Sequence, residues 1–269
     1  MEMFRRFFFA AVLAGIVAGL FSSALQQWRL VPLILQAEEY EITTQSEHVD
    51  ALILPGDAQG TPTRPTLQIP QTDAELLPLD TDMMETEESW MPQAGFERAF
   101  YTVVSTLLVS LGFAFLLVGI SVLANLEITA TNGILWGLAG FLTFSLMPAI
   151  GLPPELPGME AADLGMRQFW WWATVLSTGA ALMILARFTS PLRLPIAMAL
   201  LFIPHFVGAP PAPTVQSDVP AILASTFAAN TLFAALAFWV ALGVLYGWLN
   251  QRNLQKNHKL TKLGMSSTK

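Results

Sequence analysis

Residues 7–27 read FFFAAVLAGIVAGLFSSALQQ, an apolar stretch of 21 residues that follows Arg5 and Arg6 and contains no charged side chain. About 20 such residues carry an α-helix across the hydrocarbon core of a bilayer. Five further uncharged apolar runs follow, at residues 100–124, 133–152, 168–186, 194–209 and 222–249. The sequence therefore predicts an all-α, polytopic membrane helix bundle with about six transmembrane helices.

The fifth run leaves two alternatives, because residues 194–209 number only 16 and include Pro195 and Pro204. By length this run is a spanning helix or a re-entrant segment. If all six runs cross, nine of the 13 basic residues share one side with both termini. These nine are Arg5, Arg6, Arg187, Arg193, Arg252, Lys256, Lys259, Lys262 and Lys269. The positive-inside rule then favours six crossings, with both termini in the cytoplasm.

Composition limits the classes of function that remain. Hydrophobic residues make up 54% of the chain and charged residues 12%, which excludes a water-soluble globule. On the six-helix topology, every acidic residue except Glu2 and Glu127 lies outside, so nucleic acid is not an expected partner and cations are. The chain has no cysteine, so a metal would bind imidazole, carboxylate, amide or thioether groups.

The same pattern divides the chain into four regions. Residues 1–37 form the first transmembrane helix and its outer end, and residues 38–98 form an acidic, flexible external loop rich in Pro, Thr, Asp and Glu. Residues 99–250 form a five-helix transmembrane region, and residues 251–269 form a basic cytoplasmic tail. The first run also resembles a cleaved signal peptide, but its long apolar core favours an uncleaved helix in contact with lipid.

Glycines and tryptophans carry structural predictions. Gly–x–x–x–Gly steps, which allow two helix backbones to approach closely, occur in three of the runs. They are Gly15 with Gly19, Gly133 with Gly137, and Gly243 with Gly247. Six tryptophans lie near the expected membrane boundaries, where indole rings act as anchors. They are Trp28, Trp90, Trp170, Trp171, Trp172 and Trp248.

The candidate metal-ligating residues are carboxylates and imidazoles on the expected outer side. They are Glu38, Glu39, Glu41, His48, Glu155 and His205. Imidazole is a good ligand for cobalt, nickel or zinc, and Pro204, which precedes His205, predicts a helix break that can expose carbonyl oxygens to an ion path. The alternatives are a solvated acidic linker, a Pro-rich turn that only reverses the chain, and an interfacial histidine with one hydrogen bond.

The chain is not expected to be an enzyme or to hold a cofactor. It contains no GxxxxGK[ST], HExxH or GxSxG motif, which argues against ATP hydrolysis, metalloprotease activity and serine hydrolase activity. No Asp, Glu, Lys or Arg falls within a predicted span, which argues against a buried acidic proton relay.

Segments spread over most of the chain resemble the CbtA family of proposed cobalt transporter subunits of bacterial membranes. These segments are Phe4-Arg5-Arg6, the Gly15/Gly19 helix, Gln26-Gln27, VPLILQAEEYE at residues 31–41, Trp90-Met91-Pro92, Gly95-Phe96-Glu97-Arg98, GLAGF at residues 137–141, GLPPELPG at residues 151–158, RQFWW at residues 167–171, Pro204-His205 and Gly208-Ala209-Pro210. The first external loop departs from the family pattern, since His48 is its sole histidine.

The resemblance implies a multi-pass protein of the bacterial inner membrane that takes up Co²⁺ for cobalamin synthesis. It also implies a small histidine-bearing membrane partner subunit. On this hypothesis the outer acids attract the metal, which meets Glu38, Glu39, Glu41 or Glu155 and then passes His205. Two alternatives remain open: transport of nickel or another divalent cation, and a scaffold or accessory subunit that conducts no ion.

Overall fold

The computed structural model describes residues 2–40, 92–93, 95–212, 217 and 219–262, and within these ranges it contains helices and no strand. The elements are α1 (Glu2–Arg29), a helical segment at residues 31–40, α3 (Phe96–Ala124), α4 (Gly133–Phe141), the π-helix η2 (Leu142–Leu146), α5 (Met147–Gly151), α6 (Leu164–Arg187), α7 (Arg193–Val207) and α8 (Ala221–Lys262). Most of the loop predicted at residues 38–98, including Glu41 and His48, lies outside the described residues.

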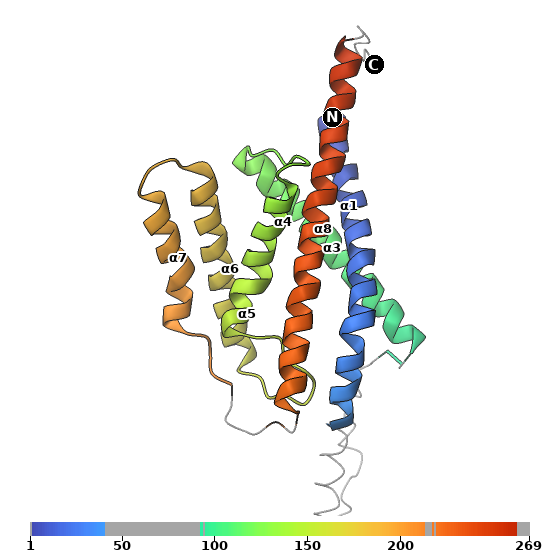
Figure 1. Cartoon of the computed structure of the whole chain (residues 1–269), viewed down its shortest axis with the longest axis vertical. Coiled ribbons are helices and arrows are strands. Elements are labelled where there is room, and N and C mark those ends of the chain that lie inside the picture. Colours follow the sequence, from blue (N-terminus) through green and yellow to red (C-terminus); the bar gives the residue numbers. More distant parts are fainter. Residues whose placement is uncertain (1, 41–91, 94, 213–216, 218, 263–269) are drawn as a thin grey trace, which may run out of the picture.

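The described elements make six passes along the bundle, and α1 begins at the same end of the bundle at which α8 ends (Figure 1). Five passes are long and apolar enough to cross a membrane; α4, η2 and α5 together make one of them, Gly133–Gly151. The remaining pass, α7, has 15 residues, or about 22 Å of helix against a hydrocarbon core of about 30 Å. The polytopic all-α bundle is confirmed, while the assignment of the shared end to the cytoplasm stays a prediction.

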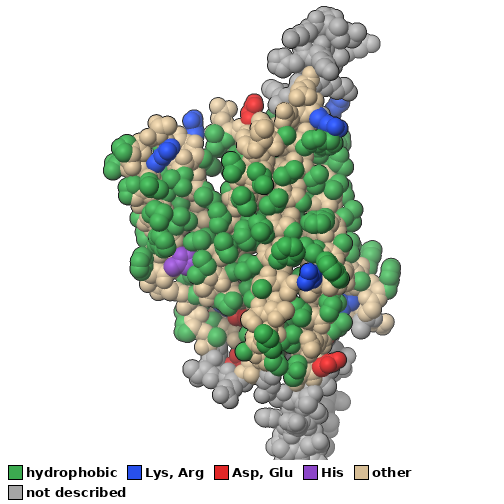
Figure 2. Space-filling model, viewed as in Figure 1, with side chains coloured by type: hydrophobic (Ala, Val, Ile, Leu, Met, Phe, Trp, Pro, Cys, Tyr) green, Lys and Arg blue, Asp and Glu red, His purple; other side chains and the backbone are tan. Residues whose placement is uncertain are grey.

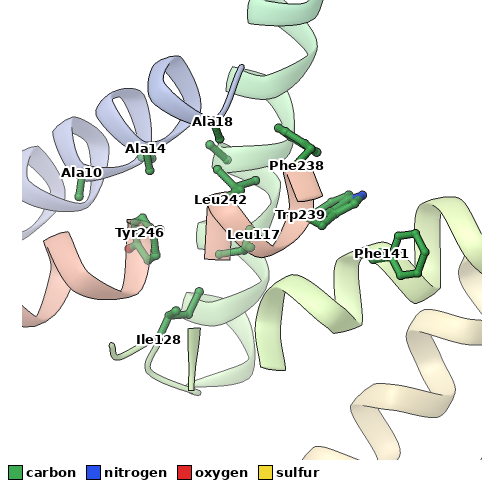
Figure 3. Close-up of a cluster of buried hydrophobic side chains, with 12 residues drawn as sticks. Ala10, Ala14, Ala18, Leu117, Ile128, Phe141, Phe238, Trp239, Leu242 and Tyr246 are labelled. Carbon is green, nitrogen blue, oxygen red and sulfur yellow. The ribbon is translucent and has the colours of Figure 1, made fainter. Parts of the chain in front are cut away.

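Small residues on α1 allow α8 to pack closely beside it. Ala10, Ala14 and Ala18 follow one another at four-residue intervals and are buried against Leu242 and Tyr246 of α8 (Figure 3). Hydrophobic side chains cover most of the face drawn in Figure 2, as expected for a surface in contact with lipid tails.

Glycine allows α4 and α8 to touch through their backbones. A Cβ atom built on Gly243 would lie 2.2 Å from Gly133 O and 2.7 Å from Gly137 N, and one built on Gly247 would lie 2.3 Å from Thr129 O. Since no side chain fits at these positions, the predicted close-packing role of this pair of glycine steps is confirmed.

The first helix uses its glycine step against α3. A Cβ atom on Gly15 would lie 3.2 Å from Ala114 Cβ, and one on Gly19 would lie 2.8 Å from Ser110 Oγ. The predicted packing role of Gly15 and Gly19 is therefore confirmed as well, although the distances to α3 at these two glycines are longer than those between α4 and α8 at Gly243.

Proline explains two departures from the sequence-based bounds. Pro32 has no N–H, so α1 ends at Arg29 and a second helical segment begins after Leu30, whose carbonyl accepts from Leu33 N and Ile34 N. Pro148 follows η2, in which the N–H of Met147 bonds five residues back to Leu142 O. The third pass is therefore an interrupted helix rather than the uniform one expected.

The last helix is much longer than the apolar run that predicts it. The run ends at residue 249, but α8 continues to Lys262 because residues 250–262 contain neither Gly nor Pro. The connection between α3 and α4 is held against α8 where the apolar run ends: Asn250 Nδ2 donates to Ile128 O at 2.8 Å, and Ala130 N donates to Gln251 Oε1 at 2.9 Å.

Candidate functional site

Glu38, the first candidate ligand, is paired with an arginine at the end of the bundle opposite the termini. The segment at residues 31–40 carries Glu38, and the first turn of α3 carries Arg98. Arg98 binds Glu38 in a bidentate manner: Nη1 donates to Oε2 at 3.1 Å, and Nη2 donates to Oε1. Hydrogen bonding from Arg98 lowers the pKa of Glu38 below its ordinary value of 4.5, opposed by partial burial and assisted by the guanidinium charge.

Replacing Glu38 with Gln is expected to lower the free energy of unfolding at neutral pH by less than about 1 kcal/mol, because the ion pair is partly exposed to solvent. Since the folded pKa lies below the unfolded one, the wild-type advantage is present above pH 4.5 and is lost as pH falls through the folded pKa. Thermal unfolding in detergent across pH measures this difference. Glu160→Gln, at an exposed position, is the control, and an advantage that grows on acidification would contradict the prediction.

Glu155 is also paired with an arginine. It lies in the connection between α5 and α6, where Arg167 Nη2 donates to its Oε2 at 2.9 Å. The next residue, Leu156, is 3% exposed and packs in the same apolar cluster as Ala37, the neighbour of Glu38. The two carboxylates therefore flank one cluster, and each is already neutralised by a guanidinium.

His205 lies near the end of α7 against α6. Its ring meets Trp170 edge-on, with ring centroids 5.7 Å apart, and its Nε2 atom is buried without a hydrogen-bond partner. Trp170 Nε1 donates to Pro204 O at 3.1 Å, and Gly208 N donates to the same carbonyl at 3.0 Å. The Nε2 atom of His205 therefore has no hydrogen-bond partner, whereas the neighbouring carbonyl of Pro204 accepts two hydrogen bonds.

Pro204 also determines how α6 holds α7. Proline has no N–H, so the carbonyl of Leu200, four residues earlier, loses its helical donor. The hydroxyl of Ser177 on α6 takes that place and donates to Leu200 O at 2.5 Å. The hydrogen bond that Pro204 removes from α7 is therefore replaced by one between α6 and α7. The carbonyl of Leu200 accepts it and is not available to an ion in this structure.

Trp170 corrects one sequence-based expectation. It was predicted to anchor the chain at the membrane boundary, but it is only 5% exposed and lies between helices. A Cβ atom on Gly151 would lie 2.4 Å from its ring, so the glycine at the end of α5 makes room for the indole. Trp172, by contrast, is 55% exposed, in keeping with an anchor.

The described part of the chain does not bring the candidate ligands into one cluster. No group of three or more His, Cys, Asp or Glu side chains that could hold a metal ion occurs among those residues. Glu39 is exposed, while Glu41 and His48 lie outside the described ranges. All six residues stay predictions as metal ligands. A divalent cation that binds at Glu38 or Glu155 would have to replace a guanidinium.

Sequence reasoning missed the residues that hold the candidates in place: Arg98, Arg167, Trp170 and Ser177. Glu38 and Arg98 are 60 residues apart, so no local spacing signals their contact. The proline in α7 does signal a carbonyl that needs a donor, but it does not say that the donor is Ser177.

Comparison with known families identifies the chain. Residues 4–251 match the family model CbtA, whose description is "Probable cobalt transporter subunit". No match is found among curated proteins or among solved structures. The matched region includes all six passes of the bundle, both arginine–glutamate pairs and His205. The chain therefore belongs to the CbtA family of probable cobalt transporter subunits.

Proposed function

We propose that this chain is the membrane subunit of a Co²⁺ uptake transporter that supports cobalamin synthesis. The observation that carries the proposal is the family match over residues 4–251. Charge supports its orientation in the bacterial inner membrane: the termini lie at one end together with Arg187, Arg193 and Arg252, and the opposite end carries the paired Glu38 and Glu155. The positive-inside rule favours a cytoplasmic position for the first of these ends.

In the proposed path, acidic side chains collect the cation outside and His205 meets it on entry. Carboxylates and an imidazole suit Co²⁺ and also Ni²⁺, so the ligand types alone do not select one metal. Arg98 and Arg167 occupy the carboxylates of Glu38 and Glu155 until a metal takes their place. The chain needs no resident cofactor for this task and carries out no catalysis.

We also propose a partner. The family description names a subunit, which indicates that the transporter contains another chain. His205 offers a single imidazole to the metal ion. A small membrane protein that bears histidines would supply further imidazole ligands. Lipid would cover the apolar surface that remains (Figure 2).

A second candidate function is an accessory scaffold that stabilises a transporter without conducting ions. The specific observation in its favour is that, over the described ranges, no three potential metal ligands meet. A scaffold needs the tight packing of α4 on α8 and does not need a converged site.

Uptake of radioactive cobalt tests the first proposal against the second. Cells that lack other cobalt importers would express the chain alone or with its candidate partner, with nickel as competitor. We expect accumulation that depends on the chain and that falls in His205→Ala and Glu155→Gln, because these remove the imidazole and one carboxylate of the path. Glu160→Gln, an exposed acid in the same connection as Glu155, is the matched control and should transport normally.

Each other outcome has a defined meaning. No accumulation in either condition, with membrane insertion verified, supports the scaffold. Unchanged uptake by a correctly inserted His205→Ala removes His205 from the path. Partial inhibition of cobalt uptake by an equal concentration of nickel indicates a transporter of divalent cations rather than of cobalt alone, and complete inhibition indicates a preference for nickel.

A further inference from the structure

Four of the passes form one interlocked unit. α1 packs along α3 and α8, and α4 packs along α8. Backbone contact between the glycines of α4 and α8 leaves no room for sliding, and Asn250 fixes the connection between α3 and α4 to α8. We call α1, α3, α4 and α8 the core unit.

The hairpin of α6 and α7 forms a second unit beside it (Figure 1). The principal packing partner of α7 is α6. Two hydrogen bonds from side chain to backbone hold the pair together, from Ser177 to Leu200 O and from Trp170 to Pro204 O. Because both bonds lie within the hairpin, the hairpin can change its position without breaking them.

The hairpin meets the core unit chiefly through η2 and α5. This stretch of the third pass has an irregular backbone. Met147 N–H bonds to Leu142 O and Pro148 has no N–H, so neither the α-helical nor the π-helical donor reaches Thr143 O. Single-turn π-helices in α-helices occur frequently at functional sites and at helix kinks, and this one lies where the two units join.

The seam between α6 and η2 is lined with buried hydroxyl groups. Thr143 of η2 and Thr174 and Thr178 of α6 are all less than a tenth exposed. Trp171 faces Phe144 of η2, with ring centroids 6.3 Å apart, and Thr178 follows Trp171 by seven residues and so lies on the same face of α6.

One hydroxyl of this seam lacks a partner. Thr178 is 1% exposed and its Oγ1 atom has no hydrogen bond. Buried polar groups ordinarily have partners, so the seam in this structure leaves the hydroxyl of Thr178 unsatisfied between the packed helices. A state in which the seam admits water or a cation would satisfy the Thr178 hydroxyl.

We infer that the hairpin of α6 and α7 moves as a rigid body about η2 and α5, and that this motion opens the seam at Thr143 and Thr178 as the passage for a hydrated divalent cation. The identity of the ion in this inference rests on the proposed transport function. The motion of the hairpin is argued from the structure alone. Hydroxyl and carbonyl oxygens are weak ligands for such an ion, as a passage requires, whereas tight ligands would retain it.

Reversible locking of the seam tests the inference. The chain has no cysteine, so an introduced pair forms a single defined disulfide. A Cβ atom on Gly179 would lie 3.8 Å from Thr143 Cγ2, so Thr143→Cys with Gly179→Cys places two thiols on facing sides of the seam, and formation of the disulfide is verified before uptake is measured. Gly15→Cys with Ala114→Cys joins α1 to α3 within the core unit and is the control, with its oxidised form compared with its own reduced form so that any effect of replacing Gly15 cancels.

In cells or liposomes that take up radioactive Co²⁺, oxidation of the seam pair is expected to abolish uptake and reduction to restore it. Oxidation of the control pair is expected to leave uptake unchanged. Full uptake by the oxidised seam pair, with disulfide formation verified, overturns the inference while leaving the proposed function intact.

A distance measurement tests the motion without any transport assay. Spin labels on Thr131→Cys and Thr189→Cys, both at exposed positions in connections at the same end of the bundle, report the separation of the hairpin from the core unit in lipid nanodiscs. Labels on Thr131→Cys and Gln255→Cys report a separation within the core unit. We expect two distance populations for the first pair and one for the second.

A single narrow distance for both pairs overturns the inference, even if the locked variant fails to fold. Two populations for the first pair without any cobalt flux support the motion and refute the transport function, so the two failures are distinguishable.

Discussion

Replacing Gly243 with alanine is expected to lower the free energy of unfolding by about 3 kcal/mol, the upper part of the range for overpacked sites. The added methyl group would lie 2.2 Å from Gly133 O and 2.7 Å from Gly137 N, so backbone atoms of α4 would have to move. Alanine gains about 1 kcal/mol over glycine in helix propensity, but this gain is smaller than the cost of separating two backbones. Thermal unfolding in detergent, monitored by the loss of the monodisperse species, measures the difference in stability between wild type and Gly243→Ala.

Gly112→Ala in α3 is the matched control for this prediction. A Cβ atom on Gly112 meets nothing within 4 Å, so the same change there adds helix propensity without a clash and should leave stability unchanged or slightly higher. Equal stability of the two variants would show that α4 and α8 are not in backbone contact in the folded protein.

Replacing Trp170 with alanine is expected to have the second large effect, a loss of about 4 kcal/mol, as for other buried aromatic residues. The change empties the space between Gly151 and the end of α7, and it removes the donor to Pro204 O and the ring beside His205. We therefore expect α7 to separate from α6 more readily. Thermal unfolding and proteolysis of the connection between α6 and α7 measure the two consequences.

Two further variants separate the causes. Trp170→Phe keeps an aromatic ring but removes the indole N–H, so it should lose less stability than Trp170→Ala. Trp172→Ala, at a position 55% exposed, removes the same side chain without opening a cavity in the protein. If Trp172→Ala destabilised the chain as much as Trp170→Ala, lipid anchoring rather than interhelical packing would explain the role of both residues.

The sequence predicted the helices because hydrocarbon thickness fixes the length of an apolar run, and every predicted run became a helix within a few residues of its expected start. The end of α8 was not predicted. The apolar run ends at residue 249, whereas the residues that follow it still favour a helix, which continues to Lys262. The π-helix was not predicted either. Pro148 signals a missing donor, but the choice between a kink and a five-residue hydrogen bond depends on the neighbouring helices.

The candidate site was predictable only in residue type. Glu38, Glu155 and His205 were selected because carboxylates and imidazole bind metals, and the structure places a partner or a neighbour on each. Arg98 and Arg167 are obvious basic residues in the sequence, yet their pairing depends on how distant segments fold together. Trp170 was misassigned because a tryptophan near a membrane boundary has the same sequence signature whether it faces lipid or another helix.

The length of α8 has a practical consequence for experiments on this protein. Residues 251–262 continue the helix by about 18 Å beyond Asn250, where the hydrogen bond to Ile128 O fixes its direction. This extension is continuous in helical structure with the part of α8 inside the bundle. A fluorophore placed near its tip would turn a small tilt of α8 into a displacement that optical methods can follow, without any alteration inside the bilayer.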